Sequence, residues 1–191
     1  MRCYTCTRLS YAIICKDCKD TLLGTTMGTR HIGSLDVISF YKYSHIESLL
    51  LTKHKPEGYR IYKALAEMTM KPFIEEFIES DDRIVYIIGV DEYVSGGYAH
   101  VAVLSKAMQT PQSIPLFASL LAQNRVRYAG KSLAFRRHHA RDFKYTGKSH
   151  IDAILIDDII TTGTTLKEAE KVLIASGVNV LFALTLADVL E

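Results

Sequence analysis

Two adjacent carboxylates followed by a loop of threonines and glycine are the residues whose types and spacing best suit chemistry. Asp157 and Asp158 come directly after the apolar run 153–156, and two residues later the chain continues with Thr161, Thr162, Gly163, Thr164 and Thr165. Backbone N–H groups and threonine hydroxyls in such a loop bind an anion such as a monophosphate. The carboxylates repel phosphate, but they accept hydrogen bonds from sugar hydroxyls or lie at the edge of a Mg²⁺ site. The pattern therefore predicts a site for ribose 5-phosphate.

The elements around these residues predict how they are positioned. Residues 153–156 suit a short buried strand that the two carboxylates end, and residues 166–173 repeat apolar side chains at helical spacing. Strand, loop and helix in this order place the loop at the carboxyl end of a parallel strand, where open α/β sheets bind ligands. We expect the carboxylates to face solvent there. An ordinary strand end with a capping turn, or the acidic pair of a receiver domain, are the alternatives, and the second leaves the threonine loop without a role.

Residues 153–165 closely resemble the phosphoribosyl diphosphate (PRPP) motif of type I phosphoribosyltransferases. In that family the acidic pair binds the ribose 2′ and 3′ hydroxyls, and the loop binds the 5′-phosphate. The resemblance implies that Asp157 and Asp158 bind the ribose of PRPP, that residues 161–165 bind its phosphate, and that Mg²⁺ accompanies the ligand. It also implies an α/β fold, with a type I phosphoribosyltransferase-like parallel sheet flanked by helices.

A second candidate site lies at the amino end, where all the cysteines form two C-x₂-C pairs: Cys3, Cys6, Cys15 and Cys18. Two such pairs provide the four thiolates of a tetrahedral Zn²⁺ site. Disulfides do not suit an intracellular chain, and a redox C-x-x-C normally opens a helix in a βαβ unit. Four protein ligands leave no open position, so we expect a structural zinc knuckle. Whether the knuckle only staples the fold or also contacts nucleic acid is left open.

Positive charge is concentrated between residues 125 and 148, which we call the basic segment. Eight cations and one carboxylate, Asp142, give it a net charge of +7, against +2 for the entire chain. Aromatic residues among the cations can stack on bases, so the segment predicts binding to single-stranded DNA. A solvated surface loop is the alternative. The candidate DNA-binding residues are Arg125, Arg127, Lys131, Arg136, Arg137, Arg141, Lys144 and Lys148.

Length and composition suit one domain with a small appendage. The chain has 191 residues, of which 48% are hydrophobic and 23% charged, as in globular proteins. No apolar run approaches the roughly 20 residues of a membrane helix, and the start resembles no signal peptide. We therefore expect a cytoplasmic protein with a zinc knuckle and linker in residues 1–34 and a phosphoribosyltransferase-like domain in residues 35–191.

Other elements can be placed more coarsely. The pattern predicts strands at 36–43, 84–89 and 179–186, and helices at 46–53, 59–70, 98–108 and from Pro72. Residues 90–97 connect a strand to a helix and contain two glycines. In type I phosphoribosyltransferases the corresponding loop holds pyrophosphate, whereas a plain connection is the alternative.

The order of these motifs resembles the ComF family of competence proteins over essentially the whole chain. One departure is that the family carries Arg-Gly-aromatic-Asn-Gln where this sequence has Gly96, Gly97, Tyr98, Ala99 and His100. The resemblance implies a role in natural transformation: handling incoming single-stranded DNA on the cytoplasmic side, binding PRPP, and meeting competence proteins at the inner membrane.

Two other functions suit the same residues. One is a catalytically active phosphoribosyltransferase of nucleotide salvage, although the sequence reaches position 191 soon after the last predicted strand and shows no evident base-recognition segment. The other is a nucleotide-sensing regulator that keeps the fold without the chemistry. Whether the protein is an enzyme is therefore left open at this point.

Overall fold

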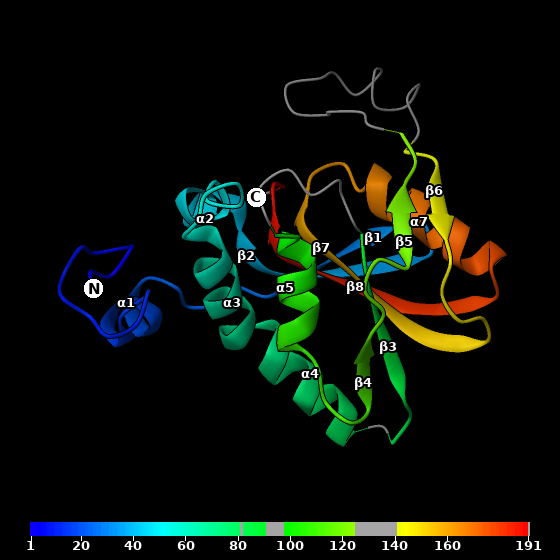
Figure 1. The fold of residues 1–191 in the computed structure, drawn as a ribbon, viewed down its shortest axis with the longest axis horizontal. Coiled ribbons are helices and arrows are strands. Elements are labelled where there is room, and N and C mark those ends of the chain that lie inside the picture. The colour runs from blue at the N-terminus through cyan, green and yellow to red at the C-terminus, as the bar shows by residue number, and fades with distance from the viewer. Residues whose placement is uncertain (81, 91–97, 125–140, 191) are drawn as a thin grey trace.

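A six-stranded sheet forms the centre of the protein (Figure 1). The computed structural model describes residues 1–80, 82–90, 98–124 and 141–190. The strand order is β1-β2-β8-β7-β3-β4, and every neighbouring pair is parallel except β1 and β2. The strands are β1 (Gly28–Ile32), β2 (Leu35–Lys42), β3 (Val85–Gly89), β4 (Ser113–Pro115), β7 (Ile151–Ile160) and β8 (Val178–Asp188). The mostly parallel α/β sheet expected from the sequence is confirmed.

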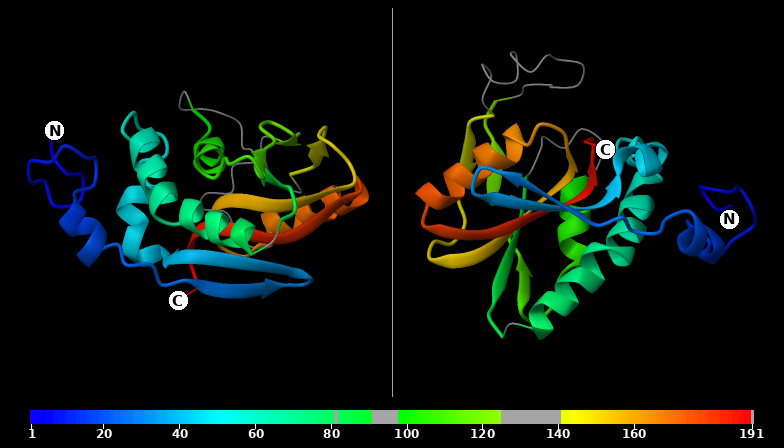
Figure 2. Two further views of the ribbon diagram at one scale, coloured as in Figure 1. Left: turned by 90° about the horizontal axis from the view of Figure 1, so that it is seen from below. Right: turned by 180° about the vertical axis from the view of Figure 1, so that it is seen from behind.

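Helices cover the sheet through two separate hydrophobic clusters. The larger cluster joins β7 residues such as Ile154 and Ile156 to four helices, which Figure 2 shows along one side of the sheet. The smaller cluster joins Ala153 and Leu155 of β7 to α7 (Thr164–Ala175). These four helices are α2 (Tyr43–Leu50), α3 (Gly58–Met68), α4 (Met70–Glu79) and α5 (His100–Ala107). Successive side chains of β7 therefore face different helical layers, as a pleated strand requires.

Two short strands and one short helix complete the described structure. Strands β5 (Leu120–Ala122) and β6 (Phe143–Tyr145) pair antiparallel, and both contribute a buried side chain to the smaller cluster. At the amino end, α1 (Lys16–Thr21) follows the segment that carries the first three cysteines. Cys3, Ile14 and Cys18 belong to the same buried cluster as α3. The knuckle, which we define as residues 3–18, therefore shares its core with the main domain.

Most expected elements are present within a few residues of their expected ends, but two expectations differ from the structure. Strand β7 does not stop before the carboxylates; it continues through Asp157 and Asp158 to Ile160, because β8 pairs beside it as far as Asp188. The expected linker contains β1, which pairs with β2 across the turn at Gly33, where φ is +68°. The division at residue 34 stays a prediction, although β1 belongs to the main sheet.

Across the described ranges of the chain, every helix is too short or too polar to span a bilayer.

Candidate functional site

The carboxyl edge of β7 brings the two carboxylates and the threonine loop (residues 161–165) together. Asp157 and Asp158 occupy consecutive positions of β7, and α7 begins four residues after the strand ends, at Thr164. Asp158 is buried on the side of α3 and α5, in the register of Ile154 and Ile156, while Asp157 is half-buried. The expectation that both carboxylates face solvent is therefore wrong for Asp158, because the strand continues and alternates its side chains.

Asp158 lies in a buried polar cluster that the sequence did not predict. Its Oδ2 atom accepts a hydrogen bond from the Tyr62 hydroxyl at 3.1 Å and one from Lys53 Nζ at 3.2 Å. His100 Nε2 lies 3.4 Å from the same oxygen, and its ring packs edge-on against Tyr62. Three residues that are distant from Asp158 in sequence thus converge on its carboxylate. Only His100 carried a sequence signal, since it occupies a position of the motif in which this chain departs from the ComF pattern.

Electrostatics keep Asp158 ionised. Burial raises the pKa of this carboxyl, but the neighbouring His100 and Lys53 outweigh burial and hold the pKa below its ordinary value of 3.8. Burial raises the pKa of Tyr62 strongly, and the carboxylate of Asp158 raises it further. At physiological pH Asp158 is therefore ionised and accepts a hydrogen bond from the Tyr62 hydroxyl.

The threonine loop has a conformation that depends on glycine. Gly163 has a φ of +74° and occupies the N-cap position of α7. A methyl group added to Gly163 would collide with the side chain of Ile32 on β1. The hydroxyls of Thr162 and Thr164 are 2.9 Å apart. The loop therefore places hydroxyls and the first N–H groups of a twelve-residue helix at the edge where Asp157 lies.

Arg30 of β1 contacts the threonine loop, and nothing in the sequence indicated this contact. Its Nη1 atom donates to the carbonyl oxygen of Thr161 at 2.7 Å and lies 3.0 Å from Asp188 Oδ1. Arg30 lies in a stretch rich in glycine and threonine, and its pattern gave no reason to expect a strand. The contact depends on β1 pairing with β2, which the local sequence does not reveal.

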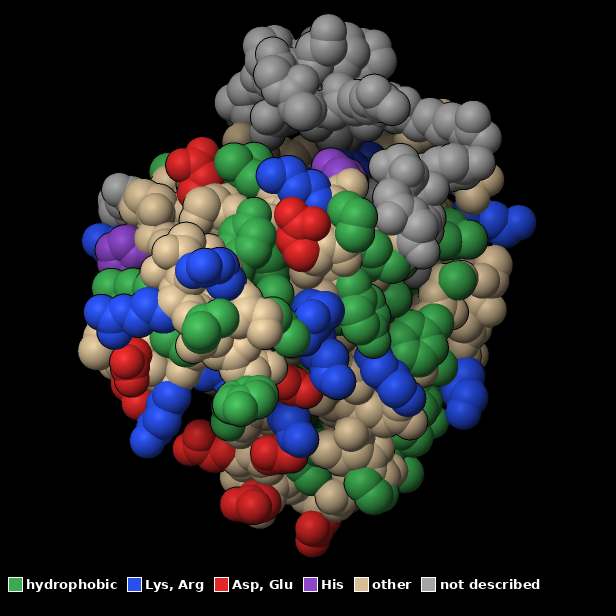
Figure 3. Space-filling view, turned by 60° about the vertical axis from the view of Figure 1, so that its left-hand side comes forward, with side chains coloured by type: hydrophobic (Ala, Val, Ile, Leu, Met, Phe, Trp, Pro, Cys, Tyr) green, Lys and Arg blue, Asp and Glu red, His purple; other side chains and the backbone are tan. Residues whose placement is uncertain are grey.

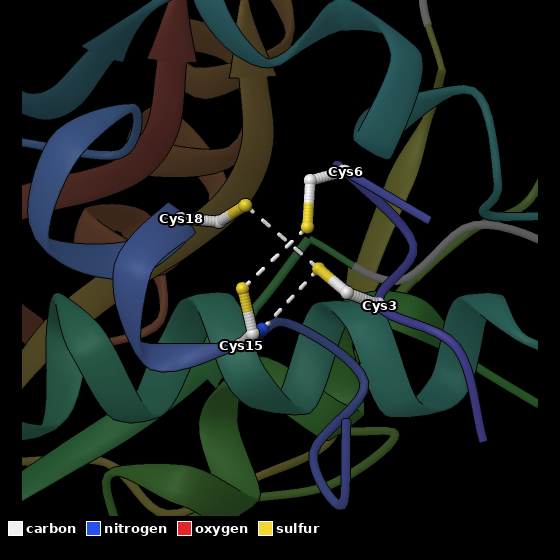
Figure 4. A group of neighbouring side chains, drawn as sticks. All are labelled: Cys3, Cys6, Cys15 and Cys18. Carbon is white, nitrogen blue, oxygen red and sulfur yellow. Dashed lines mark hydrogen bonds between the residues drawn. The ribbon is translucent and has the colours of Figure 1, made fainter. Parts of the chain in front are cut away.

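The four cysteines converge as a metal site requires (Figure 4). Their sulfur atoms all lie within 4.8 Å of one another. Cys3 and Cys18 Sγ are 3.8 Å apart, and Cys6 and Cys15 Sγ are 3.7 Å apart. A tetrahedron with Zn–S bonds of about 2.3 Å has edges of about 3.8 Å. All four thiols are free of disulfides, so the cluster fits a tetrahedral thiophilic metal such as zinc.

Thiol pKa values in this cluster are shifted in opposite directions. Burial alone would raise the pKa of Cys3, but N–H groups of Cys15, Cys6 and Thr5 lower it to about 6. Burial and the surrounding cysteine side chains raise the pKa of Cys18 far above its usual value. One thiolate therefore forms readily, and its negative charge disfavours deprotonation of the neighbouring thiols. A divalent cation offsets this repulsion, because it binds all four cysteines as thiolates.

Most of the basic segment lies outside the described residues, including Arg125, Arg127, Lys131, Arg136 and Arg137. Gly96 and Gly97, in the loop that corresponds to the pyrophosphate loop of phosphoribosyltransferases, also lie outside them. Among the described members, Lys144 is exposed on β6, and Lys148 donates to the Tyr86 hydroxyl at 3.3 Å. Arg141 is half-buried. On the face in Figure 3, the described Lys and Arg side chains are spread among acidic and apolar ones. The DNA-binding assignment therefore stays a prediction.

Comparison with known proteins gives structural neighbours only. No protein-family model matches the chain, and no curated protein matches it. A hypoxanthine phosphoribosyltransferase from Staphylococcus aureus is 19% identical with a TM-score of 0.42, and the match covers 66% of this chain and 64% of that one. The chain thus spans just under two thirds of that neighbour.

Two further solved structures are similar over more of the chain. An adenine phosphoribosyltransferase from Saccharomyces cerevisiae is 15% identical, covering 85% of this chain and 83% of its own, with a TM-score of 0.42. An orotate phosphoribosyltransferase from Aeropyrum pernix is 18% identical, covering 90% and 80%, with a TM-score of 0.38. Likenesses this distant assign no activity, so we base the function on the residues of this chain.

Proposed function

We propose that this protein binds PRPP with Mg²⁺ at the carboxyl edge of β7 and acts in DNA uptake during natural transformation, as a member of the ComF family. The observation that carries the proposal is the arrangement of Asp157, the threonine loop and the start of α7 at that edge. A carboxylate beside a loop of hydroxyls and N–H groups suits a sugar diol beside a phosphate. Thr161, Thr162, Gly163, Thr164 and Thr165 would bind the 5′-phosphate.

The division of work between the carboxylates differs from the family pattern. Asp157 is half-buried and lies on β7 shortly before the threonine loop. It is therefore the primary ligand of the ribose hydroxyls. Asp158 is buried among Lys53, Tyr62 and His100, and only 8% of its side chain is exposed for contact with the ribose. Mg²⁺ would be held mainly by the phosphates of PRPP, as is usual for this ion.

Structural zinc is the second part of the proposal. The sulfur separations of 3.7 and 3.8 Å support a tetrahedral site formed by Cys3, Cys6, Cys15 and Cys18. With every coordination position filled by protein, the ion would order the knuckle and take no part in hydrolysis. Because Cys3 and Cys18 are buried with α3, zinc would also stabilise the adjoining part of the main domain.

Binding to single-stranded DNA is the third part. It is supported by the net charge of +7 between residues 125 and 148 and by the aromatic residues within that segment. In this role the protein would act on the cytoplasmic side of the inner membrane and pass DNA to or from other competence proteins there.

Calorimetric titration with PRPP and Mg²⁺, in the absence and presence of saturating single-stranded DNA, tests the proposal. We expect binding of PRPP to the wild type, and loss of it in Asp157→Asn. Absence of PRPP binding would overturn the assignment of the edge of β7. Release of pyrophosphate from PRPP that depends on an added nucleobase would instead identify a phosphoribosyltransferase of nucleotide salvage.

DNA affinity measured against salt concentration tests the third part separately. If the basic segment binds the phosphate backbone, the logarithm of affinity falls linearly with the logarithm of salt, and Lys144→Gln reduces the slope by about one. An affinity independent of salt would contradict the assignment.

A further inference from the structure

Lys53 differs from the other donors of the Asp158 cluster in its access to solvent. Its side chain is 26% exposed, whereas that of His100 is 10% exposed and Tyr62 is fully buried. Lys53 lies in the connection between α2 and α3, at the same edge of the sheet as Asp158. Of the three donors, Lys53 is therefore the one that a bound ligand can reach.

The cluster can release Lys53 without leaving its carboxylate unpaired. Tyr62 donates to Asp158 at 3.1 Å and His100 lies at 3.4 Å, and both are fixed by their packing against each other. Lysine carries its charge on a flexible four-carbon stem, so its ammonium can turn while the stem stays in place. An anion near Lys53 can therefore draw the ammonium toward itself, whereas Asp158 keeps two partners.

The layers of the fold define which part of a sugar phosphate Lys53 would meet. The threonine loop leads into α7, on the side of the smaller hydrophobic cluster, and Lys53 lies on the opposite side with α2 and α3. A ribose with its 5-phosphate at the loop and its hydroxyls at the strand edge has carbon 1 at the end remote from the loop. With its 5-phosphate at the loop, such a ribose would have carbon 1 toward the side of the sheet that carries Lys53.

We propose that Lys53 is a specificity-determining residue that binds the anionic group on carbon 1, so that the site selects a 5-phosphoribosyl 1-diphosphate over ribose 5-phosphate. This proposal rests on the PRPP assignment above. Its physical basis is that Asp157 and Asp158 repel an anion placed beside them, and that a lysine ammonium offsets this repulsion in addition to the Mg²⁺ carried by PRPP. Lys53 is the cation that the described structure places beside Asp158 with access to solvent.

Replacement of the charge provides the test. In full-length protein at fixed Mg²⁺, Lys53→Met should weaken PRPP binding by about tenfold or more, the value of one charge-assisted hydrogen bond. Binding of ribose 5-phosphate should stay within about twofold. Lys53→Arg should retain most of the preference for PRPP. Lys55→Met, an exposed lysine of the same connection, is the matched control and should change neither affinity.

The outcomes separate this inference from the proposed function. Wild-type protein that binds neither ligand would overturn both. Wild-type protein that binds both, with Lys53→Met leaving the PRPP affinity unchanged or weakening the two ligands equally, would overturn the role of Lys53 alone. If Lys53→Met lowers the melting temperature markedly, Lys53→Gln, which keeps a donor for Asp158, provides the same comparison.

Discussion

Arg30 and Thr161 are 131 positions apart in sequence and are joined by a hydrogen bond of 2.7 Å from the guanidinium to the carbonyl oxygen. A trans peptide is planar, and its C=O and N–H point in opposite directions. The bond therefore turns the N–H of Thr162 away from Arg30. Because Asp188 neutralises the same guanidinium at 3.0 Å, Arg30 acts on the threonine loop mainly by orienting its backbone.

Replacing Arg30 should therefore weaken every ligand that carries a 5-phosphate. We expect Arg30→Met to reduce the affinity for PRPP and for ribose 5-phosphate equally, by about tenfold. Titration of both ligands measures this, and Arg60→Met, an exposed arginine on α3, is the control. A loss confined to PRPP would contradict the orienting role, because the contact lies at the loop that we propose binds the 5-phosphate.

Gly163 should tolerate no side chain. Gly163→Ala places a methyl group against Ile32 and keeps φ at +74°, so we expect destabilisation of about 1–3 kcal/mol and loss of PRPP binding. Urea unfolding measures the first effect. Gly24→Ala, where the added methyl meets nothing within 4 Å, is the control and should be nearly neutral. Equal stabilities of the two variants would show that the loop adapts.

The two carboxylates should respond differently to the loss of charge. Asp158→Asn leaves Lys53 and His100 without their anion in a buried site, so we expect a loss of stability of about 2–4 kcal/mol. Asp157→Asn should change stability by less than about 0.5 kcal/mol and abolish PRPP binding. Urea unfolding and calorimetry on both variants measure this. The opposite ranking of stabilities would refute the buried role of Asp158.

Acid should remove the contribution of Asp158. The folded-state pKa of Asp158 lies below the unfolded value of 3.8, so its stabilisation is present above about pH 4 and is lost as pH falls through the lowered folded pKa. The free energy of unfolding of wild type should therefore exceed that of Asp158→Asn at pH 7, and the difference should shrink as the pH falls below 3.8. A difference independent of pH would mean that charge plays no part.

Zinc should stabilise more than the knuckle. Cys15→Ser should reduce bound zinc below one ion per chain and loosen residues that pack with Cys3 and Cys18, including α3. Metal analysis and amide hydrogen exchange measure the two effects. Ser10→Ala, within the same knuckle, should keep zinc. Full zinc content in Cys15→Ser would show that the four-thiolate site is wrong.

Local sequence predicted the elements whose pattern is strong. The spacing of apolar residues predicted α7 and the strand core 153–156, and the two C-x₂-C pairs predicted that the four cysteines cluster. The continuation of β7 through two aspartates did not follow, because it depends on pairing with β8. Strand β1 has no buried side chain, and it forms through its pairing with β2. Lys53 reaches Asp158 across 105 positions, a contact that only tertiary packing creates.

The place of β8 in the sheet has a consequence for the order in which the chain can fold during synthesis. Strand β8 is made after the other strands of the described structure, yet it lies between β2 and β7. Until residues 178–188 have left the ribosome, the β1–β2 hairpin cannot join the β7–β3–β4 layer, and Arg30 cannot reach Thr161. Until β8 is added, the nascent protein therefore carries two separate half-sheets with open edges, and the sheet edge beside the threonine loop is incomplete.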